Sequence, residues 1–140
     1  MTLLVLVRRD SERVATALRL LQPSGAMLVV GLHDPLPPHE LRLAGRGLLG
    51  RGDRGRPHER EVDAAGREAA QDAAEELAAT ARELGFEVQG IEVTHPGPKE
   101  IDGLLARVRP ELVIVERGDR PPPPPLKHLA DRGRAGVLFI

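Results

Sequence analysis

Hydrophobic residues in this chain occur in short continuous runs that are separated by segments with helical periodicity. Three runs have the length of a strand and contain no polar residue, namely Leu3–Val7, Ala26–Val30 and Leu112–Val115. Continuous apolar runs are typical of strands that are covered on both faces. Phe86–Val93 instead alternates between apolar and polar residues around one glycine, which predicts a partly exposed edge strand. We expect a fifth, short strand at Val137–Ile140.

Helical periodicity fills the first two intervals between these runs. Ser11 is expected as the N-cap of a first helix that ends before Pro23. A second and longer helix is expected from about Glu59 to Leu84, with Gly85 as the residue that ends it. Its small residues allow it to sit close to a sheet, and the expected inward stripe is Val62, Gly66, Ala69, Ala73, Leu77 and Leu84.

The remaining segments are two helices, one proline tract and one long loop. A helix is expected over Pro98–Arg109 and a short helical turn over Leu126–Asp131. The five prolines of Pro121–Pro125 predict polyproline II. His33–His58, rich in Pro, Gly and Arg, is longer than ordinary connections and is expected to be a flexible loop.

This alternation of strands and helices predicts the fold class. Parallel strands need crossover connections, and helices on both faces of the sheet then cover the apolar runs. We therefore expect a single domain over residues 1–140, an α/β protein of three layers (an α/β/α sandwich) with a five-stranded parallel sheet.

The composition excludes several function classes. The 140 residues include no Cys, which excludes disulfide scaffolds, thiolate zinc sites and thiol nucleophiles. The absence of Trp and Tyr argues against stacking platforms for single-stranded nucleic acid, and a net charge of −1 argues against duplex DNA as a partner. No apolar run has the length of a membrane helix, and the amino-terminal run resembles a strand more than a secretory signal. We expect a cytoplasmic protein.

Two short motifs are better explained as loop residues than as sites. Gly45–Gly50 matches G-x-G-x-x-G, but prolines precede it where a dinucleotide site needs a strand. His33-Asp34 and His39-Glu40 carry zinc-type ligands, but the prolines between them give no preset geometry. We expect no metal site.

The order and spacing of several motifs resemble those of one family. They are Arg9–Glu12 at a strand-to-helix turn, Gly25–Val30 with Asp34-Pro35, Gly97–Ile101, Glu111–Val115 and Gly136–Ile140. The chain resembles the universal stress protein family over nearly its whole length. The resemblance implies strand order 3-2-1-4-5, a fold like that of the adenine nucleotide alpha hydrolases, and a homodimer formed through the last strand.

The chain departs from that family where nucleotide-binding members hold phosphates. Those members carry Gly-x-x-Gly, then nine residues, then Gly-Ser or Gly-Thr after the fourth strand, whereas this chain has Gly118 followed by five prolines from Pro121. Prolines offer no N–H donors to a phosphate. Arg9 stands near the position of the family's ribose-binding Asp. We therefore expect no cofactor, and no ATP bound in the family's manner.

Sheet topology nevertheless predicts where a ligand would bind. In open α/β sheets this is the carboxyl edge at the point where the winding reverses, here between the first and fourth strands. Arginines beside a helix N-terminus suit an anion there. The candidate binding residues are Arg9, Asp10, Ser11, Arg117, Gly118 and Arg120. In the alternative interpretation, Asp10, Glu116 and Asp119 pair with the arginines and no ligand binds.

No general acid–base pair and no activated nucleophile stand out in the sequence. We therefore expect a non-catalytic regulatory or stress-response protein that acts as a homodimer and binds an unknown protein partner. The apolar final strand supports the homodimer, and its residues are Val137, Leu138, Phe139 and Ile140. Two alternatives stay open: a nucleotide- or anion-binding regulatory domain that uses the arginine cleft, and a small hydrolase or transferase.

Overall fold

The computed structural model describes residues 1–33, 55–118, 121–133 and 135–140. All five expected strands form one parallel sheet with the order β3-β2-β1-β4-β5, which confirms the predicted fold class and strand order. The elements in chain order are β1 (Thr2–Val7), α1 (Ser11–Arg19), β2 (Ala26–Leu32), α3 (Gly55–Glu83), β3 (Glu87–Thr94), α4 (Pro98–Val108), β4 (Leu112–Val115), α5 (Pro124–Arg132) and β5 (Gly136–Phe139).

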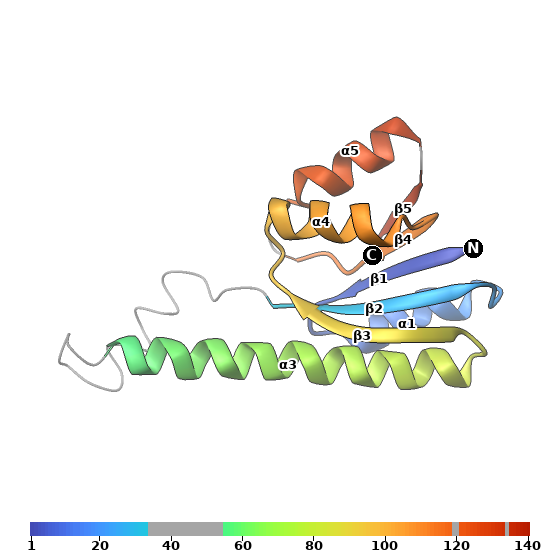
Figure 1. Ribbon diagram of the computed structural model, residues 1–140. Helices are drawn as coiled ribbons and strands as arrows, with labels where there is room; N and C mark the ends of the chain where they lie inside the picture. The colour runs from blue at the N-terminus through green and yellow to red at the C-terminus, as the bar shows by residue number, and fades with distance from the viewer. Residues whose placement is uncertain (34–54, 119–120, 134) are drawn as a thin grey trace.

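The helices cover the two faces of the sheet in pairs (Figure 1). Helices α1 and α3 pack on one face, and α4 and α5 pack on the other. Along β1, Leu3, Val5 and Val7 point into the first core, while Leu4 and Leu6 point into the second. Both sets are fully buried, so the continuous apolar run does mark a strand covered on both faces.

The glycine that interrupts the alternating pattern of β3 lies at a β-bulge. Met27 of β2 pairs with Val88, and the next residue of β2, Leu28, pairs with Gly90. Gln89 is therefore the extra residue of the bulged strand. As expected, β3 is an edge strand with no fully buried residue.

Helix α3 differs from its prediction in its start and in its buried face. It begins at Gly55 rather than Glu59, so the last residues of the predicted loop are helical, and residues 34–54 of that loop lie outside the described residues. Ala69, expected to face inward, is exposed. Ala73 and Leu77 of the predicted stripe are buried, as expected, and Ala70 is buried in place of Ala69. The whole buried face consists of Ala70, Ala73, Ala74, Leu77, Ala78 and Ala81. Gly85 has φ +96°, as the glycine that ends a helix commonly does.

Small residues bring α3 close to the sheet. A Cβ atom added to Gly31 of β2 would lie 2.4 Å from the carbonyl oxygen of Ala70. The two main chains can approach this closely only because Gly31 has no side chain. The helix is longer than the strands that it covers and extends past their carboxyl ends (Figure 1).

The N-cap of α1 is Asp10, so the prediction of Ser11 for that role is wrong. The Asp10 carboxylate accepts a hydrogen bond from the main-chain N–H of Arg13 at 3.0 Å. Ser11 is the first helical residue and is buried. Both residue types cap helices well, so only the path of the chain after β1 distinguishes them.

Helix α5 begins inside the proline tract. Pro123 has φ −56° and ψ 142°, values of polyproline II, whereas Pro124 and Pro125 are already helical. The prediction of polyproline II is therefore wrong for the last two prolines. N–H groups in the first turn of a helix have no partner within it, so prolines are tolerated there.

Strand β5 forms the other edge of the sheet and pairs only with β4 among the described strands. Val137 and Phe139 pack on the core under α4 and α5. Leu138 points to the opposite face and is 41% exposed. Within the described residues, no helix is both long and apolar enough to cross a membrane.

Candidate functional site

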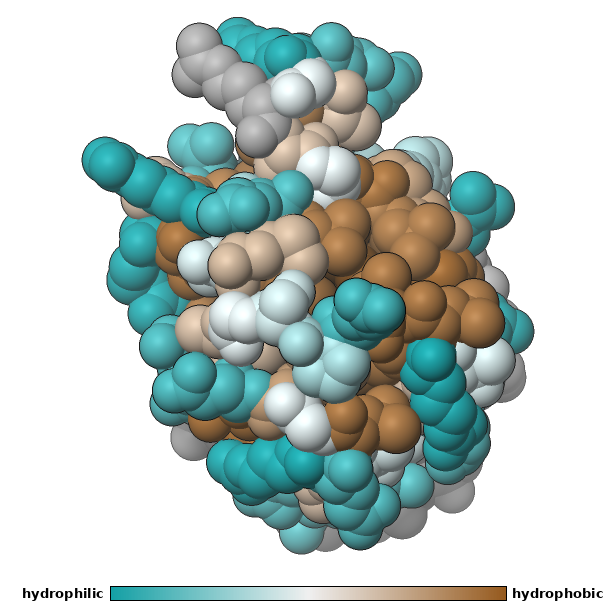
Figure 2. All heavy atoms as spheres, turned by 90° about the vertical axis from the view of Figure 1, so that its right-hand side faces the viewer, coloured by the Kyte–Doolittle hydropathy of each residue, from teal (hydrophilic) through white to brown (hydrophobic). Residues whose placement is uncertain are grey.

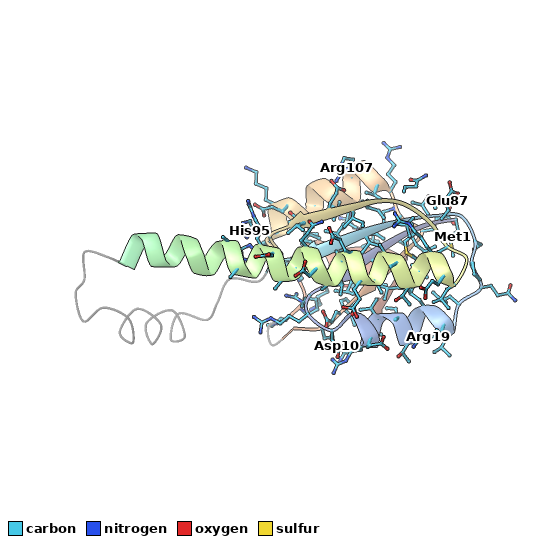
Figure 3. All side chains as sticks on the ribbon, turned by 90° about the horizontal axis from the view of Figure 1, so that it is seen from below. Met1, Asp10, Arg19, Glu87, His95 and Arg107 are labelled. Carbon is cyan, nitrogen blue, oxygen red and sulfur yellow. The ribbon has the colours of Figure 1, made fainter. Side chains whose placement is uncertain are left out.

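The candidate site lies at the carboxyl ends of β1 and β4, the two central strands where the connections turn to opposite faces. After β1 the chain enters α1 on one face, and after β4 it continues to α5 on the other face. This divergence places the first residues after each strand next to one another. Asp10 and Arg19 mark the two ends of α1 in Figure 3, and Asp10 lies at the end that belongs to this site.

A buried carboxylate, that of Glu116, occupies the centre of the site. Its side chain accepts hydrogen bonds from the main-chain N–H groups of Arg8, of Arg9 at 2.8 Å and of Asp10 at 2.7 Å. Glu116 is only 4% exposed. A carboxylate at this depth requires strong hydrogen-bond donors, and the turn between β1 and α1 supplies three.

The side chain of Arg8, which follows β1, in turn contacts the main chain of Glu116, which follows β4. Its Nε donates to the main-chain carbonyl oxygen of Glu116 at 3.0 Å. Its guanidinium lies against Gly118, where an added Cβ atom would be 3.0 Å from Arg8 Cζ. Residues 8 and 116 therefore hold the two strand ends together by both their side chains and their main chains.

A cavity of about 200 Å³ lies beside this contact. Its volume is below the range of about 300–1,000 Å³ that is usual for ligand pockets. The lining combines two arginines, one carboxylate and apolar groups: Arg8, Val115, Glu116, Arg117, Gly118, Pro122 and Phe139.

The structure places five of the six predicted site residues. Arg9 and Asp10 lie at the turn that donates to Glu116, and Ser11 follows as the buried first residue of α1. Arg117 is exposed, and its main-chain N–H donates to the carbonyl oxygen of Ile140 at 2.7 Å. Gly118 makes room for Arg8. Arg120 lies outside the described residues, as does Asp119.

The sequence predicts that Glu116 lies at this place, and in the alternative interpretation its carboxylate pairs with arginine side chains. The carboxylate of Glu116 instead accepts hydrogen bonds from the main-chain N–H groups of residues 8–10. A signal was present in the sequence, because Glu116 follows the continuous apolar run of β4 without an intervening polar residue. An acidic residue at the end of a central strand, facing a strand-to-helix turn, is placed to accept from that turn.

A second polar cluster lies at the carboxyl ends of β2 and β3. The rings of His33 and His95 are 4.9 Å apart between centroids, and a Cβ atom on Gly66 of α3 would be 2.7 Å from His33 Nε2. Figure 3 shows His95 beside the middle of α3. Among the residues that the structure describes, no group of three or more potential metal ligands occurs. Asp34, His39-Glu40 and Gly45–Gly50 lie outside these residues.

A larger groove, of about 660 Å³, lies between α4 and α5. The two helices contribute equally to its lining, which is Pro98, Lys99, Asp102, Leu105, Ala106, Pro124, Pro125, His128, Leu129 and Arg132.

Comparison of the fold with solved structures identifies its type. No protein-family model and no curated protein matches the sequence. The structure of universal stress protein UspA from Lactobacillus plantarum matches 100% of this chain and 97% of its own chain, with a TM-score of 0.61 and 14% identity. The chain has the universal stress protein fold.

Two further structures share the universal stress protein fold seen here. The hypothetical protein MJ0577 covers 98% of this chain with 94% of its own, at a TM-score of 0.59 and 14% identity. The hypothetical protein PH0823 covers 99% with 94% of its own, at a TM-score of 0.53 and 14% identity. These matches run over nearly the whole chain, and at 14% identity they show its fold alone.

Proposed function

We propose that this chain is a member of the universal stress protein family that acts without catalysis, as a regulatory homodimer in the cytoplasm. Its likeness in fold to UspA from Lactobacillus plantarum supports the family. The observation that carries the homodimer is the open, apolar edge of β5. A protein partner of the dimer, still to be identified, is part of the proposal.

The edge strand β5 supports association with a second copy. Its outer main-chain groups are not used by β4, and a strand edge of this kind is a template for pairing with another chain. Leu138, 41% exposed, places a large apolar side chain in the middle of this edge. Figure 2 shows hydrophobic side chains gathered on one side of the face that it views. Burial of such side chains favours association.

The test is the oligomeric state of the protein and of one variant, measured by size exclusion with multi-angle light scattering. We expect a dimer for the unchanged chain and a monomer for Leu138→Glu, because the new carboxylate would be buried without a partner in the interface. The matched control is Leu20→Glu at the end of α1, where the leucine is 85% exposed. A monomeric unchanged chain, or dissociation by the Leu20 variant alone, would contradict the proposal.

The geometry of Glu116 supports the absence of catalysis. A general base needs a free acceptor that can reach the proton it removes. The Glu116 carboxylate is buried and accepts from three main-chain N–H groups. It acts on the protein's own main chain and is not poised to act on a substrate.

The second candidate function is nucleotide or anion binding, and the cavity beside Arg8 and Arg117 favours it. Isothermal titration with AMP, ATP and inorganic phosphate distinguishes the two candidates. The proposal expects no heat of binding at about 1 mM ligand, a concentration at which a functional anion site is largely filled. A saturable heat for any of these ligands favours the second candidate.

A further inference from the structure

We propose that Glu116 is an internal occupant of the turn between β1 and α1, an autoinhibitory contact that closes this turn to anions. The proposal concerns the carboxyl end of the sheet. It does not depend on the homodimer or on the family.

The donors converge on Glu116 in the manner of an anion-binding turn. The N–H groups of Arg8, Arg9 and Asp10 are consecutive, and all three donate to one carboxylate. Successive N–H groups that point into one concavity bind anions in many proteins. The amino end of α1, which begins at Ser11, adds its positive dipole end directly behind them.

The position of Glu116 is fixed by the sheet, so the carboxylate is held in this turn. Its main-chain N–H donates to the carbonyl oxygen of Leu6 at 2.9 Å, which continues the ladder between β1 and β4. Arg8 Nε holds its carbonyl oxygen from the other side. With both main-chain groups held, the side chain has a short and defined reach into the turn.

An external anion cannot share this turn with Glu116. The three N–H groups already donate to the carboxylate, and a second negative charge at this distance is repelled in a site of low dielectric constant. Removal of the carboxylate leaves three donors and joins the space that it occupied to the adjoining cavity of about 200 Å³, which Glu116 lines. The inference is that loss of Glu116 gives the chain a phosphate site that the unchanged protein does not have.

The experiment measures phosphate binding by the unchanged protein and by Glu116→Ser. Serine removes the charge and the bulk and leaves one hydroxyl to support the turn. Melting temperatures are compared in potassium phosphate and in potassium chloride of equal ionic strength, and the affinity for inorganic phosphate is measured by titration calorimetry. Phosphate stabilises folded proteins in general, so we expect it to raise the melting temperature of Glu116→Ser by more than that of the unchanged protein. We also expect Glu116→Ser to bind phosphate at least about tenfold more tightly than the unchanged protein does.

Two variants separate an anion site from a general loss of stability. Glu116→Gln removes the charge but keeps the bulk in the turn, so we expect it to lose stability without gaining phosphate binding. Glu111→Ser makes the same change at the opposite end of β4, where the side chain is exposed, and is expected to resemble the unchanged protein in both buffers.

Three results would overturn the proposal. One is phosphate binding to the unchanged protein as tight as to Glu116→Ser. Another is a folded Glu116→Ser that phosphate neither binds nor stabilises. The third concerns a serine variant that unfolds in chloride: phosphate must then restore its circular dichroism, and failure to do so counts against the site.

Discussion

At the scale of single residues, two carboxylates organise the turn between β1 and α1 in different ways. Glu116 accepts from the three N–H groups that precede the helix, while Asp10 accepts from the N–H of Arg13 within its first turn. The N–H groups of the turn before α1 thus donate to a distant residue, and an N–H group of the first helical turn donates to a local one. The amino end of α1 is held to β4 by the first and is capped by the second.

The cap gives a prediction for Asp10. Replacement of Asp10 by alanine removes the acceptor for Arg13 N–H, and we expect it to lower the free energy of unfolding by about 1 kcal/mol. Urea denaturation followed by circular dichroism measures this loss. The control is Asp131→Ala in the last turn of α5, where an exposed acid caps nothing and the expected change is within about 0.5 kcal/mol. Equal losses in the two variants would show that Asp10 is not the cap.

At the scale of elements, β2 and α3 make a close contact between the sheet and a helix layer. Gly31 and the alanines of α3 allow the helix main chain to approach the strand directly. Helix α3 packs on the sheet mainly through small side chains. Helices α4 and α5 pack on the opposite face through larger ones, such as Ile101, Leu104 and Leu126.

This contact predicts the effect of a single methyl group on Gly31. The Cβ of Gly31→Ala would lie 2.4 Å from the carbonyl oxygen of Ala70, a main-chain atom that can move only with its helix. We expect a loss of about 1–3 kcal/mol in the free energy of unfolding, the usual effect of overpacking.

The control is the same substitution in a helix with open space. Nothing lies within 4 Å of the Cβ position of Gly103 in α4. Gly103→Ala is therefore expected to raise stability by about 0.5–1 kcal/mol, because alanine loses less conformational freedom on folding. Denaturant titrations measure the free energy of unfolding of both variants. An unchanged free energy of unfolding for Gly31→Ala would mean that α3 does not lie this close to β2.

The sequence predicted the elements better than their ends. Continuous apolar runs identified β1, β2 and β4 because burial on both faces leaves no polar position in the strand. The alanine-rich α3 was harder, since Ala69 and Ala70 are chemically identical and only packing against Gly31 selects the inward one. The helical start at Pro124 was missed because proline suits both polyproline II and the first turn of a helix.

For the candidate site, the sheet topology predicted which segments meet but not which donor and acceptor groups form the hydrogen bonds. Parallel strands with opposite crossovers require residues 8–11 and 116–118 to meet, and the structure confirms that they do. Which acceptor meets which donor depends on side-chain reach and on the path of the turn. The sequence pattern fixes neither of these, and guanidinium groups seemed the natural partners for Glu116.

At the scale of the whole molecule, the carboxyl ends of the central strands and the side edge formed by β5 differ in how their polar groups are used. The carboxyl edge of the central strands is closed by Glu116 and Arg8. Among the described strands, β5 pairs with β4 alone, and Leu138 of this apolar strand is exposed. These two features are the basis of our proposal that the chain associates with a second copy through the β5 edge and does not bind a triphosphate at the centre of the sheet.

Native mass spectrometry of the purified protein, without added ligand, tests this account most directly, because it reports subunit number and bound nucleotide together. We predict one species at twice the chain mass of 15.2 kDa, with no additional mass. A monomer, or a species that carries the added mass of a nucleotide on each chain, would contradict the account.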